Sequence, residues 1–428
     1  MPRRWLSNCD GPAARLEVSL RTVQRDTCDS QTRCVPIEGE ARRRPLARVQ
    51  AANCRNFRDE PCRTLANLLR ADACWRPHPA VLGQTQAMYP IESFNWGLIG
   101  PGGIAHRFAA AVNGLPGARL QAVLARDAQR GAAFAQQWAR EGTAVPTVHT
   151  DLQALLADPS VQAVYIATPH DSHARLAGEC LRAGKPVLCE KPLTPTLAQT
   201  HALIEASATH RVFLMEALWS RFLPVYDQVA QWLRSGAIGA VRTMQSSFCF
   251  NVPFDATHRV FNPQLAGGAM LDIGIYNLAL TRFVLENSLG ACPEPERIVA
   301  SGTLAPTGVD QRVGGMLVFQ GGVIAQWVCA FDATSDNALV VNGEHGSIRL
   351  PTRFWEGTRA VLAVKGQAEV ICEAPFRING FEGEIEEAMR CISAGLLESP
   401  RMPHAETLAL ARWNHQVLRQ MGVRYPFD

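Results

Sequence analysis

Long apolar runs are absent from this sequence. No stretch of eighteen or more uninterrupted apolar residues occurs in its 428 residues, so the pattern of a membrane-spanning helix is missing.

A large excess of positive charge is missing too. The formal net charge is only +3, whereas a nucleic-acid-binding protein normally concentrates far more positive charge on one face. We therefore expect neither a membrane nor a nucleic acid as a partner.

Cysteine pairs with metal-binding spacing are also missing. The 13 cysteines are scattered and no two have the C-x-x-C spacing that zinc sites usually need. His170 and His173 are three residues apart, but no third ligand is evident nearby, so we predict no metal site. Without a secretory signal, scattered cysteines fit a reducing compartment, and we expect a cytoplasmic protein.

Lysine is scarce: the chain has three, and residues 1–87 have none. Those residues hold 15 Arg and 9 acidic residues, with no helical or strand period sustained over a whole element. They match neither a secretory signal nor an acid-poor transit peptide. We expect residues 1–87 to be a disordered leader or an artefact of the gene model, with Met88 as the true first residue.

From Phe94 onward the sequence is regular. A strand, a glycine turn, a helix and a second strand follow one another, which is the order of a β-α-β unit. Strand and helix patterns keep alternating, so residues 88–220 predict a doubly wound parallel sheet. Beyond them, strand-like segments alternate in polarity between Gly-containing turns. Residues 221–428 therefore predict an α+β domain with a large, mainly antiparallel open sheet.

A glycine-rich turn joins the first strand to its helix. The segment GPGGIA reads G-x-G-x-x-A. Glycines at such a join let backbone N–H groups approach a pyrophosphate, and the helix N-terminus stabilises its charge. A tight turn that binds nothing is the alternative, but the flanking strands and helix favour dinucleotide binding. The predicted contacts are Gly100, Gly102, Gly103, Ile104 and Ala105.

The end of the second strand bears on the choice of dinucleotide. An acidic residue there would hold the 2′-hydroxyl of NAD, whereas an Arg would accommodate the 2′-phosphate of NADP. The chain reads Ala125-Arg126-Asp127. Arg126 favours NADP, while Asp127 keeps NAD open.

Glu190-Lys191-Pro192 ends a later strand at the edge where doubly wound sheets bind ligands. Nearly all basic residues of this chain are Arg, but position 191 carries the amine of a lysine. A lysine ammonium has a tunable pKa, which acid–base chemistry requires and Arg does not offer. An ordinary exposed lysine is the alternative.

Asp272 and Tyr276 follow a second glycine pair and are four residues apart, which on a helix places them on one face. The pKa of a Tyr hydroxyl is near 10, but a neighbouring ammonium would lower it. We expect Lys191 to supply that charge. The alternative is that Tyr276 packs in the core and Asp272 is a first-turn helix acid.

At these residues the chain resembles the Gfo/Idh/MocA oxidoreductases. The resemblance runs from Trp96 to the C-terminus and rests on six strings in order. They are WGLIGPGGIA, AVYIATPHDSHA, GKPVLCEKPL, VFLMEALWSRFLP, GGAMLDIGIY and ESPRMP. The fourth and fifth strings point to the branch of dimeric dihydrodiol dehydrogenases and NADP-dependent D-xylose 1-dehydrogenases.

The resemblance implies a Rossmann domain followed by an α+β domain that binds substrate and forms a dimer. It implies Lys191, Asp272 and Tyr276 as catalytic residues, with Tyr276 where many members carry His. Trp219 and Arg221 fall in a segment close to the cofactor and substrate cleft, without assigned roles. The cofactor contacts implied beyond the glycine turn and Arg126 are Thr168, Pro169, His173, Glu190 and Lys191.

These observations predict an NAD(P)-dependent oxidoreductase, with NADP as the favoured cofactor. It would transfer a hydride between the nicotinamide and a CH–OH or carbonyl carbon of a sugar or trans-dihydrodiol. A non-enzymatic sensor of the same fold and an NAD-dependent glycosidase are the alternatives. The sequence leaves the exact substrate open, since family membership does not settle it.

Overall fold

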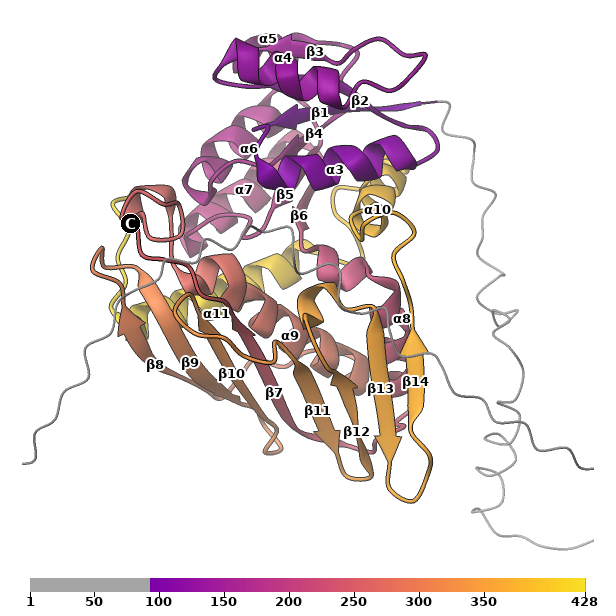
Figure 1. The fold of residues 1–428 in the computed structure, drawn as a ribbon, viewed down its shortest axis with the longest axis vertical. Coiled ribbons are helices and arrows are strands. Elements are labelled where there is room, and N and C mark those ends of the chain that lie inside the picture. Colours follow the sequence, from indigo (N-terminus) through magenta and orange to yellow (C-terminus); the bar gives the residue numbers. More distant parts are fainter. Residues whose placement is uncertain (1–92, 428) are drawn as a thin grey trace, which may run out of the picture. The chain divides into compact units, whose positions relative to one another are not determined.

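The computed structural model describes residues 93–427. The expectations for the leader, residues 1–87, and for Met88 lie outside the described residues. The described part of the chain contains two sheets and the helices that cover them (Figure 1).

The first sheet is parallel, with the strand order β3-β2-β1-β4-β5-β6. Its inner strands are buried on both faces, which is why they read as continuous apolar runs. The strands are β1 (Phe94–Ile99), β2 (Ala118–Leu124), β3 (Thr147–His149), β4 (Ala163–Ile166), β5 (Val187–Glu190) and β6 (Leu214–Ala217). The connecting helices are α3 (Gly103–Gly114), α4 (Ala128–Gln137), α5 (Leu152–Ala157), α6 (His173–Arg182) and α7 (Leu197–His210).

The strand order reverses between β1 and β4. The chain leaves β1 toward β2 on one side and later returns to β4 on the other. In doubly wound sheets the crevice at the carboxyl ends of such strands binds ligands. Gly100 follows β1 and Thr168 follows β4 at this edge.

The second sheet has the order β14-β13-β12-β11-β7-β10-β9-β8. Its neighbours are antiparallel except for β7 and β10, which run parallel. The strands are β7 (Val241–Cys249), β8 (Arg297–Leu304), β9 (Asp310–Val318), β10 (Ile324–Ala330), β11 (Leu339–Gly343), β12 (Gly346–Leu350), β13 (Arg359–Val364) and β14 (Val370–Glu373).

Helices cover one face of this second sheet. The helices α8 (Pro224–Arg234), α9 (Ile275–Leu289) and α11 (His404–Met421) pack against it, and α11 also packs on α7 of the first sheet. In Figure 1 these helices lie behind the strands, and α10 (Glu382–Ser393) lies beside α3. One continuous core of buried side chains therefore joins the two sheets.

The helical segment Pro263–Leu289 is long and apolar enough to cross a membrane by composition alone. In this structure its most apolar window of eighteen residues is wholly buried inside the described protein. Its residues from Ile275 to Leu285 are buried without exception, and the helix has almost no polar face. A helix that is apolar all round is expected at the centre of a large protein, which is where it lies.

The predicted fold class is confirmed: a doubly wound parallel sheet is followed by a mainly antiparallel open sheet. The sequence analysis did not single out the short strand β3 or the strands β8, β12 and β13. One further difference concerns the segment that carries Asp272. We expected a regular helix there, but Met270–Gly274 forms a π-helical turn before α9 begins.

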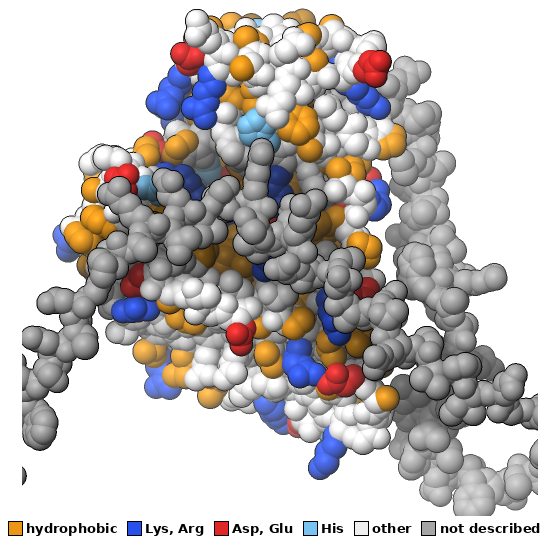
Figure 2. Space-filling model, viewed as in Figure 1, with side chains coloured by type: hydrophobic (Ala, Val, Ile, Leu, Met, Phe, Trp, Pro, Cys, Tyr) orange, Lys and Arg blue, Asp and Glu red, His pale blue; other side chains and the backbone are white. Residues whose placement is uncertain are grey.

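Charged side chains are intermingled on the face of the described residues shown in Figure 2. Lys and Arg alternate there with Asp and Glu instead of gathering in one basic patch. This distribution accords with the small net charge of the whole chain.

Candidate active site and cofactor cleft

A cleft of about 1,320 Å³ opens at the carboxyl ends of β1, β2, β4 and β5. Pockets for drug-sized ligands measure roughly 300–1,000 Å³, so this cleft has room for a larger ligand or for two ligands together. Residues of the second domain close its far side. The predicted residues on its wall are Gly100, Gly102, Gly103, Ile104, Arg126, Thr168, Pro169, Glu190, Lys191, Asp272 and Tyr276.

The glycine turn is shaped to bring its backbone close to a ligand. Gly100 has φ +91, and a Cβ placed there would lie 2.6 Å from Thr168 Cγ2. A Cβ on Gly103 would meet nothing within 4 Å, since the space in front of it is open. The N-terminus of α3 begins at this point and can stabilise a negative charge. These residues fit the pyrophosphate of a dinucleotide.

Arginine side chains gather at the end of the cleft near β2. Arg126, Arg130 and Arg175 all line it. Asp127 instead caps α4: its carboxylate accepts a 2.7 Å hydrogen bond from the Arg130 N–H. Arg130 and Arg175 were not among the predicted contacts; the four-residue spacing of Arg126 and Arg130 at the start of one helix was the available signal.

Two predicted cofactor contacts lie behind the wall of the cleft. Ala105 and His173 are fully buried, and neither borders the open volume. His173 places Nδ1 2.9 Å from the Pro192 carbonyl oxygen and Nε2 2.9 Å from the Thr168 carbonyl oxygen. The histidine therefore links the segments that follow β4 and β5.

Lys191 reaches from the end of β5 to the π-helical turn. Its Nζ donates to the Asp272 carbonyl oxygen at 2.5 Å and lies 3.4 Å from Asp272 Oδ1. The side chain is about nine-tenths buried. One ammonium thus contacts both the backbone and the carboxylate of the same residue, which fixes its position at the floor of the cleft.

Asp272 lies among positive charges. Arg259 donates to both carboxylate oxygens, each at 3.1 Å, and His170 Nε2 lies 3.9 Å from Oδ1. Burial opposes ionisation of Asp272, but Lys191 and Arg259 outweigh it and hold its pKa well below the usual range. Asp272 is therefore an anion at neutral pH. Burial also lowers the pKa of His170 to about 3, so the ring is neutral.

Tyr276 faces the cleft from the first turn of α9. Its hydroxyl oxygen accepts a 2.9 Å hydrogen bond from Trp219 Nε1, and Lys191 Nζ lies 5.1 Å from the centre of its ring. We expected Lys191 to lower the pKa of this hydroxyl. The structure contradicts that: burial, with the charges of nearby carboxyls, raises the Tyr276 pKa well above 10. Tyr276 is a neutral phenol in this structure.

Asp272 lies in the π-helical turn and Tyr276 in the α-helix that follows it. A π-helical turn is wider than an α-helical one, and such turns occur often at functional sites. Asp310 supports it, because its Oδ2 accepts a 2.6 Å hydrogen bond from the Met270 N–H. Asp272 and Tyr276 both line the cleft although the segment between them is not a regular α-helix.

Glu190 stands at the end of β5, next to Lys191. Its carboxylate accepts a short hydrogen bond from the Tyr165 hydroxyl, and burial raises the pKa of Glu190.

Aromatic side chains form another part of the cleft wall. Phe248 stacks on Trp355 with ring centres 3.4 Å apart. The further aromatic residues of the wall are Trp219, Phe250 and Phe381.

Among residues 93–427, no cluster of three or more His, Cys, Asp or Glu could hold a metal ion. The groups that line the cleft include an ammonium, a carboxylate and a phenol around an open volume. Such a set can bind an anionic ligand and exchange a proton with a substrate oxygen.

Comparison with known proteins identifies the family. A family model described as oxidoreductase family, NAD-binding Rossmann fold, matches residues 94–218, and the model of the family's C-terminal domain matches residues 226–349. Trans-1,2-dihydrobenzene-1,2-diol dehydrogenase of Danio rerio is 33% identical over 344 residues, covering 78% of this chain and 99% of that protein. The Homo sapiens protein of the same name is 32% identical over 343 residues, with coverages of 78% and 99%.

Solved structures agree with this result. The aldose-aldose oxidoreductase of Caulobacter crescentus, complexed with glycerol, has a TM-score of 0.67 at 25% identity and covers 77% of this chain and 97% of its own. A 3-ketoreductase of Actinomadura kijaniata with NADP has the same TM-score at 24% identity, covering 77% and 98%, and shows the shared fold. The chain therefore belongs to the Gfo/Idh/MocA family of NAD(P)-binding oxidoreductases, as its motifs predict.

Proposed function

We propose that this protein is an NADP-dependent dehydrogenase or reductase. It acts on a CH–OH or carbonyl carbon of a trans-dihydrodiol or a sugar. The observation that carries the proposal is the meeting of Lys191, Asp272 and Tyr276 on one cleft that begins at the glycine turn. A protein that only senses a dinucleotide has no need for these three groups together.

The nicotinamide, when bound, supplies or accepts the hydride. Tyr276 holds a proton at its hydroxyl oxygen, since burial raises its pKa. In the reducing direction it gives this proton to the substrate oxygen, and in the oxidising direction it takes the proton back. Lys191, 5.1 Å from the ring, balances the negative charge left on the phenol. Asp272 holds the ammonium in place.

NADP is supported by the charges at the ribose end of the cleft. Arg126, Arg130 and Arg175 line that end, and guanidinium groups suit a phosphate. The Asp127 carboxylate already accepts a hydrogen bond from the backbone of α4, which makes it a poorer partner for the 2′-hydroxyl of NAD.

A ring-shaped substrate is supported by the aromatic wall of Phe248, Trp355 and Trp219, because aromatic side chains pack on apolar ring faces. A trans-dihydrodiol is the first compound to test. The dihydrodiol dehydrogenases support this choice, because nearly their whole length aligns with this chain. Sugars are the second class.

We also propose a cytoplasmic homodimer. The described cysteines are all free, which supports a reducing compartment. Exposed apolar residues on the outer strands of the second sheet, Val299, Leu304, Val370 and Ile371, support an interface between copies. Light scattering of the purified protein tests the dimer, and a monomeric mass would contradict it.

The proposed activity is tested by following reduced-nicotinamide absorbance with the purified protein. NADP and NAD are each offered with a panel of trans-dihydrodiols, aldoses and dicarbonyl compounds. We expect turnover with NADP and at least one diol or sugar. Tight NADP binding with no turnover across the panel would contradict the proposal and favour the sensor.

A further inference from the structure

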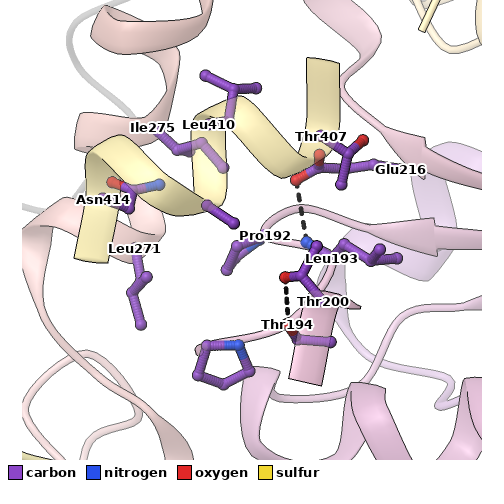
Figure 3. A pocket seen from close by; sticks show the side chains of 12 residues that line it. Pro192, Leu193, Thr194, Thr200, Glu216, Leu271, Ile275, Thr407, Leu410 and Asn414 are labelled. Atoms are coloured by element: carbon purple, nitrogen blue, oxygen red, sulfur yellow. Dashed lines mark hydrogen bonds between the residues drawn. The ribbon is translucent and has the colours of Figure 1, made fainter. Parts of the chain in front are cut away.

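The backbone directly after Lys191 is held on both sides by buried ionisable side chains. The Pro192 carbonyl oxygen lies 2.9 Å from His173 Nδ1. The Leu193 N–H, which belongs to the same peptide group, donates a 2.9 Å hydrogen bond to Glu216 Oε1 (Figure 3). Both contacts hold the peptide group that joins Pro192 to Leu193, and so they restrain the backbone directly after Lys191.

Glu216 has no contact with the cofactor cleft. It lies in β6, pairs in register with Cys189 of β5, and is 3% exposed. Its second oxygen, Oε2, has no hydrogen-bond partner that meets normal geometry among the described residues. Burial of a carboxyl group is costly unless it is hydrogen-bonded, so the bond from the Leu193 N–H helps to keep Glu216 in this position.

A small cavity beside Glu216 lies directly behind the candidate catalytic residues. Its volume is about 10 Å³, close to the space that a single water needs. Each candidate catalytic residue has a chain neighbour that lines this cavity. These neighbours are Pro192, next to Lys191; Leu271, next to Asp272; and Ile275, next to Tyr276. Figure 3 shows the Pro192–Thr194 segment lying between the α11 helix and Thr200. A shift of the Pro192–Thr194 segment would therefore displace the backbone beside all three candidate catalytic residues.

The charges around Glu216 are few. Burial raises its pKa to about 7, and the charge of Glu406 acts in the same direction. The Leu193 N–H, the Thr407 hydroxyl and the Lys191 ammonium favour its ionised form. In either protonation state Oε1 can accept the Leu193 hydrogen bond, so the contact does not depend on the charge.

We propose that Glu216 is a positioning residue for Lys191. By accepting the Leu193 N–H bond it holds the Lys191–Leu193 segment where the ammonium meets Asp272 and the cleft. This role of Glu216 rests on the proposed function, because Glu216 acts only through Lys191, a proposed catalytic residue.

Two substitutions separate positioning from simple packing. Glu216→Ala leaves the Leu193 N–H buried without an acceptor, and we expect kcat to fall roughly 10- to 100-fold, as a misplacement of about 1 Å can cause. Glu216→Gln keeps an acceptor oxygen of the same shape, and we expect kcat near that of the unchanged protein. The Kd for NADPH, measured by fluorescence, should stay the same in both.

Ser207→Ala is the matched control. Ser207 is fully buried in the same domain, and its hydroxyl donates a 2.7 Å hydrogen bond to the Val212 carbonyl oxygen away from the cleft. We expect it to lower the melting temperature as Glu216→Ala does, with kcat per folded protein unchanged.

An unchanged kcat in Glu216→Ala, or a loss in Glu216→Gln as large as in Glu216→Ala, would overturn the proposal. A crystal structure of Glu216→Ala with the Lys191–Leu193 segment and the Lys191–Asp272 contact unmoved would overturn it as well, whether or not a substrate is known. Absence of turnover in the unchanged protein would instead count against the proposed function, so the two failures are distinct.

Discussion

Trp219 Nε1 donates a 2.9 Å hydrogen bond to the hydroxyl oxygen of Tyr276. Trp219 follows β6 in a 3₁₀ turn, whereas Tyr276 begins α9, so the bond joins the two domains at the floor of the cleft. It fixes the direction of the phenol and favours its ionised form, against the effect of burial. The acidity of the Tyr276 hydroxyl, which we propose exchanges the substrate proton, therefore depends on a residue 57 positions away.

Removing this bond should weaken catalysis and raise the Tyr276 pKa further. A net hydrogen bond contributes about 0.5–1.5 kcal/mol, so we expect Trp219→Phe to lower kcat by up to about tenfold. The basic limb of the pH–rate profile should move to higher pH, because the phenolate loses a donor. A basic limb that moves to lower pH would contradict this account of the bond.

The arginines at the ribose end should decide cofactor choice. A hydrogen bond to a charged group contributes about 1.5–3 kcal/mol, so Arg126→Ala and Arg130→Ala should each lower kcat/KM for NADP about 10- to 100-fold. The kcat/KM for NAD should change little. Arg140→Ala, at an exposed position outside the cleft, is the control and should alter neither. An equal loss for both cofactors would argue against 2′-phosphate recognition.

The glycine turn can be tested with a pair of alanine substitutions. Gly100 and Gly142 both have positive φ, but a Cβ meets Thr168 at Gly100 and open space at Gly142. Backbone strain of about 1–3 kcal/mol should destabilise both variants. Only Gly100→Ala should also weaken NADPH binding in a fluorescence titration. Equal NADPH affinity in the two variants would show that the turn does not contact the cofactor.

The lowered pKa of Asp272 makes stability depend on pH. The folded pKa lies below the unfolded value of about 3.9, so the folded protein gains stability from this group above that value. The gain is lost as the pH falls toward the folded pKa. Asp272→Asn removes the gain and leaves Lys191 and Arg259 without their anion, a loss of about 3 kcal/mol for a buried pair.

Urea unfolding of the unchanged protein and Asp272→Asn, followed from pH 7 to pH 3, measures this effect. The difference in unfolding free energy between the two should be largest at neutral pH and shrink below pH 4. A difference that stays constant over this range would mean that the Asp272 pKa is the same in the folded and unfolded states, and so is not lowered by Lys191 and Arg259.

The sequence alone was sufficient for the fold class, and it named three candidate catalytic residues that line one cleft, for identifiable reasons. The inner parallel strands are buried on both faces and so carry a continuous apolar pattern. The edge strand β3 is only three residues long, and β8 is largely exposed, so neither carries a strong pattern. Lys191 stood out because the chain uses Arg for nearly all its other basic residues, and Tyr276 because it lies four residues after Asp272, behind a glycine pair.

Other parts of the site depend on contacts between distant segments. Trp219 and Tyr276 are brought together by the packing of α9 against the 3₁₀ turn Trp219–Phe222 that follows β6. The Tyr276 pKa was predicted in the wrong direction because sequence spacing gives the neighbouring charge but not the extent of burial. His173 was placed on the cofactor, yet it lies one layer behind, since spacing cannot show which way a helix-start residue points.

The central claim is that Lys191 and Tyr276 perform the proton chemistry of a nicotinamide-dependent reaction. It is tested most directly by measuring kcat and the NADPH Kd of Tyr276→Phe and Lys191→Met. Tyr226→Phe loses a buried hydroxyl bond to Phe354 outside the cleft, and Lys365→Met alters an exposed lysine; both serve as controls. We predict a loss of kcat of about 100-fold or more in the first pair, with the Kd unchanged, and normal kcat in the controls. Near-normal kcat in both Tyr276→Phe and Lys191→Met would contradict the account.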